Sequence, residues 1–121
     1  MDDRVRRALR EGRTIDITTT GRTSRRARRT EIWFHNLDGK VYITGTPGKR
    51  DWYANLVAHP EFQFHLKEGI VADLAARATP ITDPAVRRAV LIRIVDRVGR
   101  TADLEAWLVE SPLVEVTFEH D

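Results

Sequence analysis

The sequence predicts a mainly β (α+β) protein in which six antiparallel strands close into a small barrel flanked by short helices. Three observations lead to this fold. Apolar and polar residues alternate over several short segments, which is the pattern of half-buried strands. An Asp-Gly pair at 38–39 joins two of these segments as a tight hairpin. Six antiparallel strands in 121 residues favour closure, because a closed barrel leaves no unpaired edge.

The chain begins with a predicted helix and a predicted strand. Residues 3–11 can form a short helix that ends at Gly12. This segment is too short and too charged to predict contact with a membrane surface. Residues 14–20, "TIDITTT", alternate Ile15 and Ile17 with polar neighbours and therefore predict a strand.

Two strands are predicted around the Asp-Gly turn. Residues 30–37 form the first and residues 40–46 return antiparallel as the second. Apolar side chains occupy both faces of the first strand, with Ile32 and Phe34 on one face and Trp33 and Leu37 on the other. A single small barrel cannot bury both faces, so we expect a homodimer.

A short helix is predicted after this hairpin. Asp51 is placed to cap a helix over 52–58, and Pro60 ends it. Trp52 and Leu56 would face the core. A helix between the third and fourth strands would therefore plug or cap the barrel.

The second half of the chain continues the same pattern. Asp83-Pro84 is typical of a helix start, since an N-cap is followed by proline at the first helical position. The expected elements are strands at 61–66 and 69–81, helices at 84–98 and 102–109, and a last strand at 113–118. The apolar stripe of the longer helix would comprise Val86, Ala89, Val90, Ile94 and Val98.

The composition fits one globular domain over residues 1–121. Apolar residues make up 41% and charged residues 31%, and no apolar run approaches the ~20 residues of a membrane-spanning helix. The absence of cysteine excludes disulfides, thiolate metal ligands and thiol nucleophiles. Residues 1–12 contain no apolar leader, so we expect a cytoplasmic protein.

The sequence contains no recognisable metal site or nucleophile motif. The histidines are scattered, and they are His35, His59, His65 and His120, the last beside the chain end. Each is expected to be a surface or packed histidine. Glu31 stands alone in its strand, and neither Ser24 nor Ser111 lies in a catalytic motif. An enzyme with this sequence would therefore rely on a bound cofactor, with the protein supplying placement and electrostatics.

Two basic loops flank the central hairpin. Residues 21–30, "GRTSRRARRT", contain five arginines and no acid, namely Arg22, Arg25, Arg26, Arg28 and Arg29. Residues 45–52, "GTPGKRDW", combine glycines with Lys49 and Arg50 just before a helix N-terminus, which favours anions. Either loop alone is more typical of solvated surface. Together they predict a cradle for an anionic ligand.

Nucleic-acid binding is the other interpretation of the arginines. Five arginines could contact phosphates and give salt-dependent binding. However, no aromatic residue lies within residues 22–29 to stack on bases, and the net charge is only +2. We therefore expect a small-molecule ligand and no nucleic acid.

Three motifs occur along the chain in a recognisable order. They are T-T-G-R-x-S at 19–24, the Asp-Gly hairpin, and W-Y-x-N-L-x-A-x-P at 52–60. In this order they resemble the deazaflavin (F420)-dependent nitroreductase and quinone reductase family of actinobacteria. The resemblance runs from about Ile17 to Leu66, and more loosely to Ala78. Arg25 stands where family members usually carry a glycine.

The resemblance implies a split β-barrel, akin to the FMN-binding pyridoxamine-phosphate oxidases, that pairs as a dimer and binds coenzyme F420. It implies hydride transfer from the reduced deazaflavin to a quinone, nitroaromatic or enone, without a dedicated acid–base residue. The residues that it assigns to the cofactor are Arg22, Ser24, Arg28, Arg29, Thr46, Pro47, Gly48, Lys49, Arg50, Trp52 and Asn55. FMN or heme in place of F420, and a non-catalytic flavin-, heme- or lipid-binding protein on the same barrel, are the alternatives.

Overall fold

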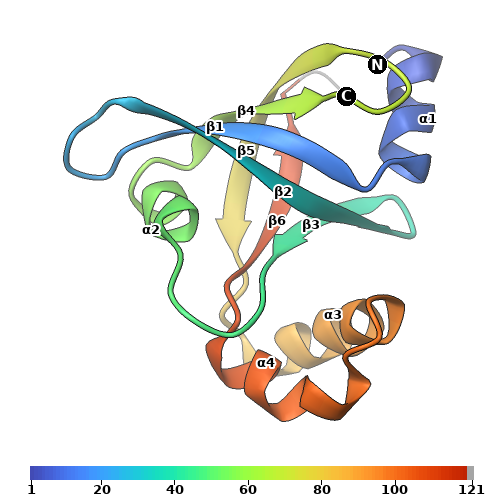
Figure 1. Ribbon diagram of the computed structural model, residues 1–121, viewed down its shortest axis with the longest axis vertical. Helices are drawn as coiled ribbons and strands as arrows, with labels where there is room; N and C mark the ends of the chain where they lie inside the picture. Colours follow the sequence, from blue (N-terminus) through green and yellow to red (C-terminus); the bar gives the residue numbers. More distant parts are fainter. Residues whose placement is uncertain (120–121) are drawn as a thin grey trace.

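Six antiparallel strands close into a barrel, as the sequence predicts, and their order around the barrel is β1-β2-β3-β6-β5-β4 (Figure 1). The strands are β1 (Thr14–Thr20), β2 (Ala27–Leu37), β3 (Lys40–Thr44), β4 (Glu61–Leu66), β5 (Ala72–Pro80) and β6 (Leu113–Phe118). Pairing of β1 with β4 completes the barrel. The computed structural model describes residues 1–119, so the expectation for His120 lies outside the described residues.

Four helices and one 3-10 turn surround the barrel. They are α1 (Asp3–Glu11), α2 (Asp51–Ala58), α3 (Pro84–Arg97), the 3-10 turn η1 (Thr101–Asp103) and α4 (Leu104–Glu110). Figure 1 shows α2 below the β1–β2 loop, α1 on the opposite side, and α3 with α4 below the barrel. Within residues 1–119, none of these helices has the length and apolar character needed to cross a membrane.

The main apolar cluster fills the barrel. Ile15 from β1 is fully buried, and the rings of Phe34 and Phe64 meet edge to face with centroids 5.4 Å apart. Trp52 and Leu56 bring the apolar side of α2 into the same cluster. The prediction that this helix caps the barrel is therefore confirmed.

A second apolar cluster lies outside the barrel wall. Leu37 from β2 and Tyr42 from β3 pack against α3 and α4, in a cluster that includes Leu91 and Trp107. The outer face of β2 is therefore partly covered within one chain, which the sequence did not indicate. Trp33 on that face stays 51% exposed.

The buried face of α3 differs from the predicted stripe. Val86 is 47% exposed and Ala89 is also exposed, so both assignments to the core were wrong. The buried positions are Val90, Leu91, Ile94 and Val95, which lie toward the C-terminal end of the helix. These four positions share the side of the helix that packs against the second cluster, whereas Val86 and Ala89 lie on the side turned away from it. The predicted Asp83 cap is confirmed, since its carboxylate accepts from the backbone N–H of Val86.

Several element boundaries also differ from the prediction. β2 begins at Ala27 instead of residue 30, because its pairing with β1 continues to the Thr20–Ala27 pair. Arg28 and Arg29 therefore lie on a strand and not in a loop. β3 ends at Thr44, two residues early, and β5 begins three residues late at Ala72.

The start of α2 was also predicted incorrectly. Arg50 occupies the N-cap with extended backbone angles, and no side chain caps the helix. Asp51 is the first helical residue instead of the cap. Its carboxylate still lies near the positive end of the helix dipole, where a negative charge is favourable.

Candidate cofactor-binding site

The loop between β1 and β2, residues 21–26, is a compact turn held by backbone hydrogen bonds, and we call it the arginine loop. The N–H of Gly21 donates to the carbonyl of Arg26 at 2.8 Å, and the N–H of Arg25 donates to the carbonyl of Gly21 at 3.0 Å. A Cβ at Gly21 would lie 2.4 Å from the Ser24 hydroxyl oxygen. That hydroxyl accepts from the N–H of Arg26 at 3.2 Å, so Ser24 shapes the loop.

Asn55 ties this loop to helix α2. Its Oδ1 accepts from the backbone N–H of Arg22 at 3.0 Å, and its Nδ2 donates to the Thr19 hydroxyl at 3.2 Å. Asn55 is only 6% exposed and Thr19 only 2% exposed. A buried side chain with both ends bonded fixes its neighbours, so Asn55 sets the position of the arginine loop relative to the helix.

The two arginines on β2 point to opposite faces of the strand. Arg28 pairs in register with Thr19, so it lies on the face that turns toward Asn55 and α2. Arg29 lies on the other face, where its Nε donates to Asp16 at 3.0 Å. Strand alternation therefore assigns the two neighbours different roles.

Arg29 belongs to a charge network on the outer wall of the barrel. Lys67 donates to Asp16 at 2.7 Å and also contacts Glu31, so Glu31 is not isolated as the sequence suggested. Hydrogen bonds from Lys67 and Arg29 hold the pKa of Asp16 below its ordinary value. Much of the charge of Arg29 is thus balanced within the chain.

The arginine loop, β2 and α2 together enclose a polar cavity of about 440 Å³, which we call the arginine pocket. Its lining residues are Gly21, Arg22, Thr23, Ser24, Arg28, Arg29, Thr30, Asp51, Trp52 and Asn55. Within residues 1–119, the side chains of Arg22 and Arg28 make no hydrogen bond or ion pair. The pocket therefore presents two guanidinium groups that are available to an anion.

The second basic loop is braced by Arg50. Its guanidinium donates to the carbonyl of Lys49 at 3.0 Å and to both the carbonyl and the hydroxyl of Thr46, at 3.0 and 2.7 Å. The N–H of Gly48 donates to the carbonyl of Glu110 at 3.1 Å. Arg50 thus holds the shape of the loop, while the ammonium group of Lys49 has no partner within the described part of the chain.

This second loop opens on a different cavity, of about 580 Å³. Its lining residues are Gly48, Lys49, Arg50, Tyr53, Thr82, Arg87, Val109, Glu110, Ser111 and Pro112. Successive residues of a helix point about 100° apart, so Trp52 and Tyr53 face different cavities. Their rings are in edge contact, with centroids 6.1 Å apart. The two predicted halves of the cradle therefore lie on two sides of the first turn of α2.

The structure thus divides the predicted site residues into three groups. One group lines the arginine pocket, namely Arg22, Ser24, Arg28, Arg29, Trp52 and Asn55. Gly48, Lys49 and Arg50 line the other cavity, and Thr46 and Pro47 line neither. Thr46 instead anchors Arg50.

Two important residues were missed from the sequence. Thr19 anchors Asn55, and the alternation of β1 would have placed it inward beside Ile15 and Ile17. Arg87 donates to four backbone carbonyls, those of Ile81, Trp107, Leu108 and Ser111. It therefore ties α3 to the segment that follows β5 and to the end of α4. No sequence pattern indicates this role, because the acceptors are backbone carbonyls, and three of the four lie at least twenty residues away in the chain.

His35 and His65 are both buried. His65 is 7% exposed, and its two ring nitrogens lie 2.7 Å from the Thr18 hydroxyl and 2.7 Å from Asp73. Burial, with Arg97 and Arg13 nearby, lowers the pKa of His35 to about 4. No group of three metal-binding side chains gathers within residues 1–119.

Solved structures show which fold this is. The chain is 16% identical to the conserved hypothetical protein Rv2991 from Mycobacterium tuberculosis, covering 99% of this chain and 82% of that one, with a TM-score of 0.76. It is 15% identical to HutZ, the heme storage protein from Vibrio cholerae, with coverages of 97% and 89% and a TM-score of 0.75. An F420 reductase gives 17% identity, coverages of 93% and 90%, and a TM-score of 0.66.

Sequence comparison supplies the family. No curated protein matches the sequence significantly. The model of the F420H(2)-dependent quinone reductase family matches residues 2–104, well beyond the three motifs. The chain therefore belongs to the F420H(2)-dependent quinone reductase family.

Proposed function

We propose that this protein is an F420-dependent oxidoreductase that transfers hydride from the reduced deazaflavin to a quinone, nitroaromatic or enone. Family membership supports the cofactor and the reductase chemistry. Quinones are the acceptor in the family's description, and the two other acceptor classes extend it to related electron-poor compounds.

The arginine pocket fits the anionic part of this cofactor. F420 carries a phosphate and a polyglutamate tail, and guanidinium groups are the side chains best suited to bind both. Arg22 and Arg28 have no partner of their own within residues 1–119, and Asn55 fixes the loop that carries Arg22. This pair of uncompensated arginines on a rigid support is the observation that carries the proposal.

The chain's own residues have distinct roles in this proposal. Arg22 and Arg28 bind the anion, whereas Asn55 positions the loop and Trp52 forms part of the wall. Arg29 contributes less, because Asp16 already pairs with it. When bound, the deazaflavin supplies the hydride, and the protein provides orientation and positive potential.

The alternatives differ in what they require of the pocket. FMN also carries a phosphate, so binding must distinguish it from F420. A heme needs an axial ligand such as His, Cys, Met or Tyr, and none of these residue types lines the arginine pocket. This pocket therefore favours a phosphate-bearing cofactor over heme.

Titration of the purified protein with F420, followed by quenching of the cofactor's fluorescence, tests this proposal. Arg28→Gln should raise the Kd for F420 about tenfold, as expected for one lost charge-assisted hydrogen bond. Arg26→Gln removes an equal charge from the loop just before β2, outside the pocket lining, and should change the Kd little. Tighter binding of FMN than of F420, or equal effects of the two variants, would contradict the proposal.

We also propose that the protein acts as a homodimer that pairs through the outer face of β2. Trp33 is the candidate contact residue, because its side chain is 51% exposed on this face and aromatic side chains are enriched in protein–protein interfaces. Phe34 does not contribute, because it is 2% exposed inside the barrel.

A further inference from the structure

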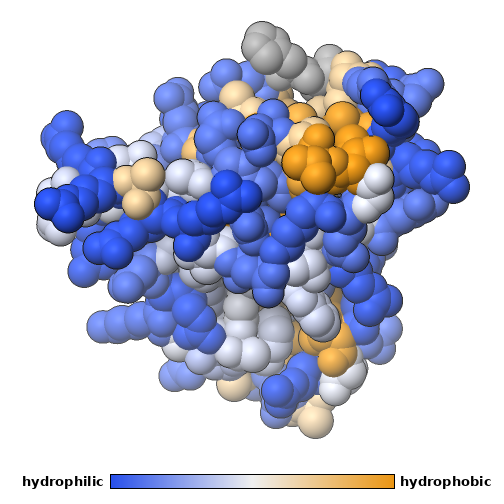
Figure 2. Space-filling view, turned by 45° about the horizontal axis from the view of Figure 1, so that its top comes forward, coloured by the Kyte–Doolittle hydropathy of each residue, from blue (hydrophilic) through white to orange (hydrophobic). Residues whose placement is uncertain are grey.

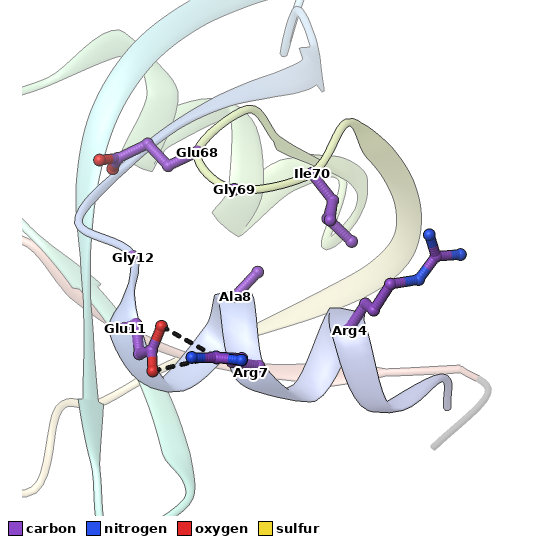
Figure 3. Close-up of a pocket in the computed structure, with 8 residues that line it drawn as sticks. All are labelled: Arg4, Arg7, Ala8, Glu11, Gly12, Glu68, Gly69 and Ile70. Carbon is purple, nitrogen blue, oxygen red and sulfur yellow. Dashed lines mark hydrogen bonds and ion pairs between the residues drawn. The ribbon is translucent and has the colours of Figure 1, made fainter.

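A third cavity, on the side of the barrel away from the arginine pocket, has a different chemical character. It has a volume of about 530 Å³ and lies between α1 and the turn that joins β4 to β5. Figure 3 shows Ala8 and Ile70 pointing into it from the two walls. We call it the α1 cavity. Its volume is in the range of ordinary small-molecule sites.

The floor of the α1 cavity is apolar and rigid. Ala8 is 7% exposed and belongs to the main core cluster, against which Ile70 also packs. Gly12 completes the floor at a point where a Cβ would lie 3.2 Å from the ring of Phe34. Ala8 and Ile70 therefore give the floor of the cavity an apolar character, whereas the other side chains that line the cavity are charged.

Both carboxylates at the rim already have partners. Glu68 accepts hydrogen bonds from the backbone N–H groups of Thr14 and Arg13, and in Figure 3 its side chain lies away from Ile70. Glu11 accepts two bonds from Nε of Arg7, at 3.2 and 3.3 Å. These contacts keep the negative charges at the rim in place.

Arg4 is the remaining charge at the rim. Its side chain is 80% exposed, and its closest ion pair within residues 1–119 is a 3.7 Å approach to Asp2. The Asp2 carboxylate is itself engaged in capping α1, where it accepts from the backbone N–H of Arg4 at 2.6 Å. The guanidinium can therefore accept a new anionic partner at low cost.

Apolar surface continues beyond the cavity. Val71, the next residue along the turn, is 87% exposed. Figure 2 shows apolar surface where this turn meets the strongly hydrophilic side chains of α1. The cavity thus has an apolar floor, apolar surface beside its opening and the available guanidinium of Arg4. These features match a ligand with a hydrocarbon chain at one end and a negative charge at the other.

We propose that the α1 cavity binds an amphiphilic monocarboxylate, such as a medium-chain fatty acid, with its carboxylate on Arg4 and its chain along Ala8, Gly12 and Ile70. A single charge is specified because Arg4 offers one guanidinium at the rim, whereas Arg7 is already paired with Glu11. The site is independent of F420 and of the proposed reductase activity, since it shares no lining residue with the arginine pocket.

Backbone chemical shifts in the ¹⁵N-labelled protein, titrated with sodium decanoate below its micelle concentration, test the proposal. Saturable shifts are expected for residues 4–12 and 67–71. Butanoate should shift them little, because its chain is too short to cover the floor. Decyl phosphate as the dianion should bind more weakly than decanoate.

The matched variants are Arg4→Gln and Arg6→Gln. Arg4→Gln should raise the Kd for decanoate about fivefold, as for the loss of one exposed ion pair. Arg6 lies on the same helix but pairs with Asp3 and lies outside the cavity lining, so its variant should bind decanoate normally. Ile70→Ser should weaken decanoate more than butanoate.

Three results would overturn the proposal. The first is the absence of saturable shifts in the α1 cavity, and the second is equal weakening by Arg4→Gln and Arg6→Gln. The third is binding to phosphatidylglycerol vesicles without binding to free decanoate, which would make the same surface a lipid-bilayer contact. None of these results bears on F420 binding, because they are read at different residues.

Discussion

At the scale of single residues, Arg25 is the most unusual position in the chain. Its φ of 59° places it in the left-handed region, where a side chain costs about 1–2 kcal/mol. The turn requires this conformation, because the N–H of Arg25 bonds to Gly21 within a closed loop. A glycine at this position, which members of the family usually carry, would form the same turn without strain.

Arg25→Gly is therefore expected to leave the protein as stable as it is now, or to stabilise it by up to about 1 kcal/mol. Arg25→Val should destabilise it by about 1–2 kcal/mol, since a β-branched side chain tolerates a positive φ least well. Urea unfolding of the three proteins measures the difference. Loss of stability in the glycine variant would show that the arginine side chain itself supports the loop.

His35 gives the protein a predictable sensitivity to acid. Its pKa is about 4 in the folded protein, against 6.5 when exposed, so the unfolded chain takes up the proton first as pH falls. Stability should be complete above pH 6.5 and decline between about 6.5 and 4, by roughly 2–3 kcal/mol from this residue. His35→Gln should flatten that part of the pH profile of urea unfolding, and an unchanged slope would contradict the assignment.

For single residues, the sequence indicated candidates for the site but not the contacts that each of them makes. The arginines and Asn55 were identified from motifs. Both Arg28 and Arg29 line the pocket, but spacing alone could not show that Arg29 is also paired with Asp16. That distinction depends on the β1–β2 register. Likewise Ser24 and Arg50 were expected to touch the cofactor, whereas their bonds in the structure support the loops around them.

At the scale of elements, α2 joins the barrel to the site. One face of the helix packs Trp52 and Leu56 into the core, and Asn55 on the same helix fixes the loop after β1. The helix was predictable because its breakers and apolar spacing are strong. The bonds of Asn55 were not, since Thr19 and Arg22 lie more than thirty positions earlier in the chain.

Asn55→Ala should uncouple the loop from the helix. It removes two hydrogen bonds and leaves the buried Thr19 hydroxyl without one partner, at a cost of about 1–3 kcal/mol in the free energy of unfolding. The Kd for F420 should rise about tenfold, because Arg22 is no longer held in place. Urea unfolding and fluorescence titration measure the two effects.

Asn36→Ala is the matched control for this experiment. Asn36 also makes two hydrogen bonds, to the carbonyl of Leu9 and from the N–H of Gly39, but lies outside the arginine pocket. Its variant should lose stability and keep its affinity for F420. Equal loss of affinity in both variants would mean that general loosening of the fold, and not loop position, controls binding.

At the scale of the whole molecule, the closed barrel follows from the sequence because several segments alternate apolar and polar residues and the Asp-Gly turn joins two strands as a hairpin. The second apolar cluster does not follow, since it depends on how α3 and α4 fold back over Leu37 and Tyr42. That cover removes part of the apolar excess on β2. The proposed dimer contact therefore rests on Trp33, which stays exposed on this face.

Trp33→Glu should convert a dimer to monomers in sedimentation experiments, because it places a charge in the proposed contact. Val109→Glu is the control, since Val109 is 80% exposed on α4 and does not lie on the outer face of β2. A monomeric wild-type protein, or unchanged sedimentation of the Trp33 variant, would argue against this interface. Phe34→Glu is unsuitable, because it would place a charge inside the barrel.

The most direct test of the central claim is a crystal structure of the protein with F420. The account predicts that the anionic part of the cofactor contacts Arg22 and Arg28 in the arginine pocket, with the bonds of Asn55 to Arg22 and Thr19 retained. An anionic part bound only at Lys49, on the other side of the first turn of α2, or bound in the α1 cavity, would contradict it.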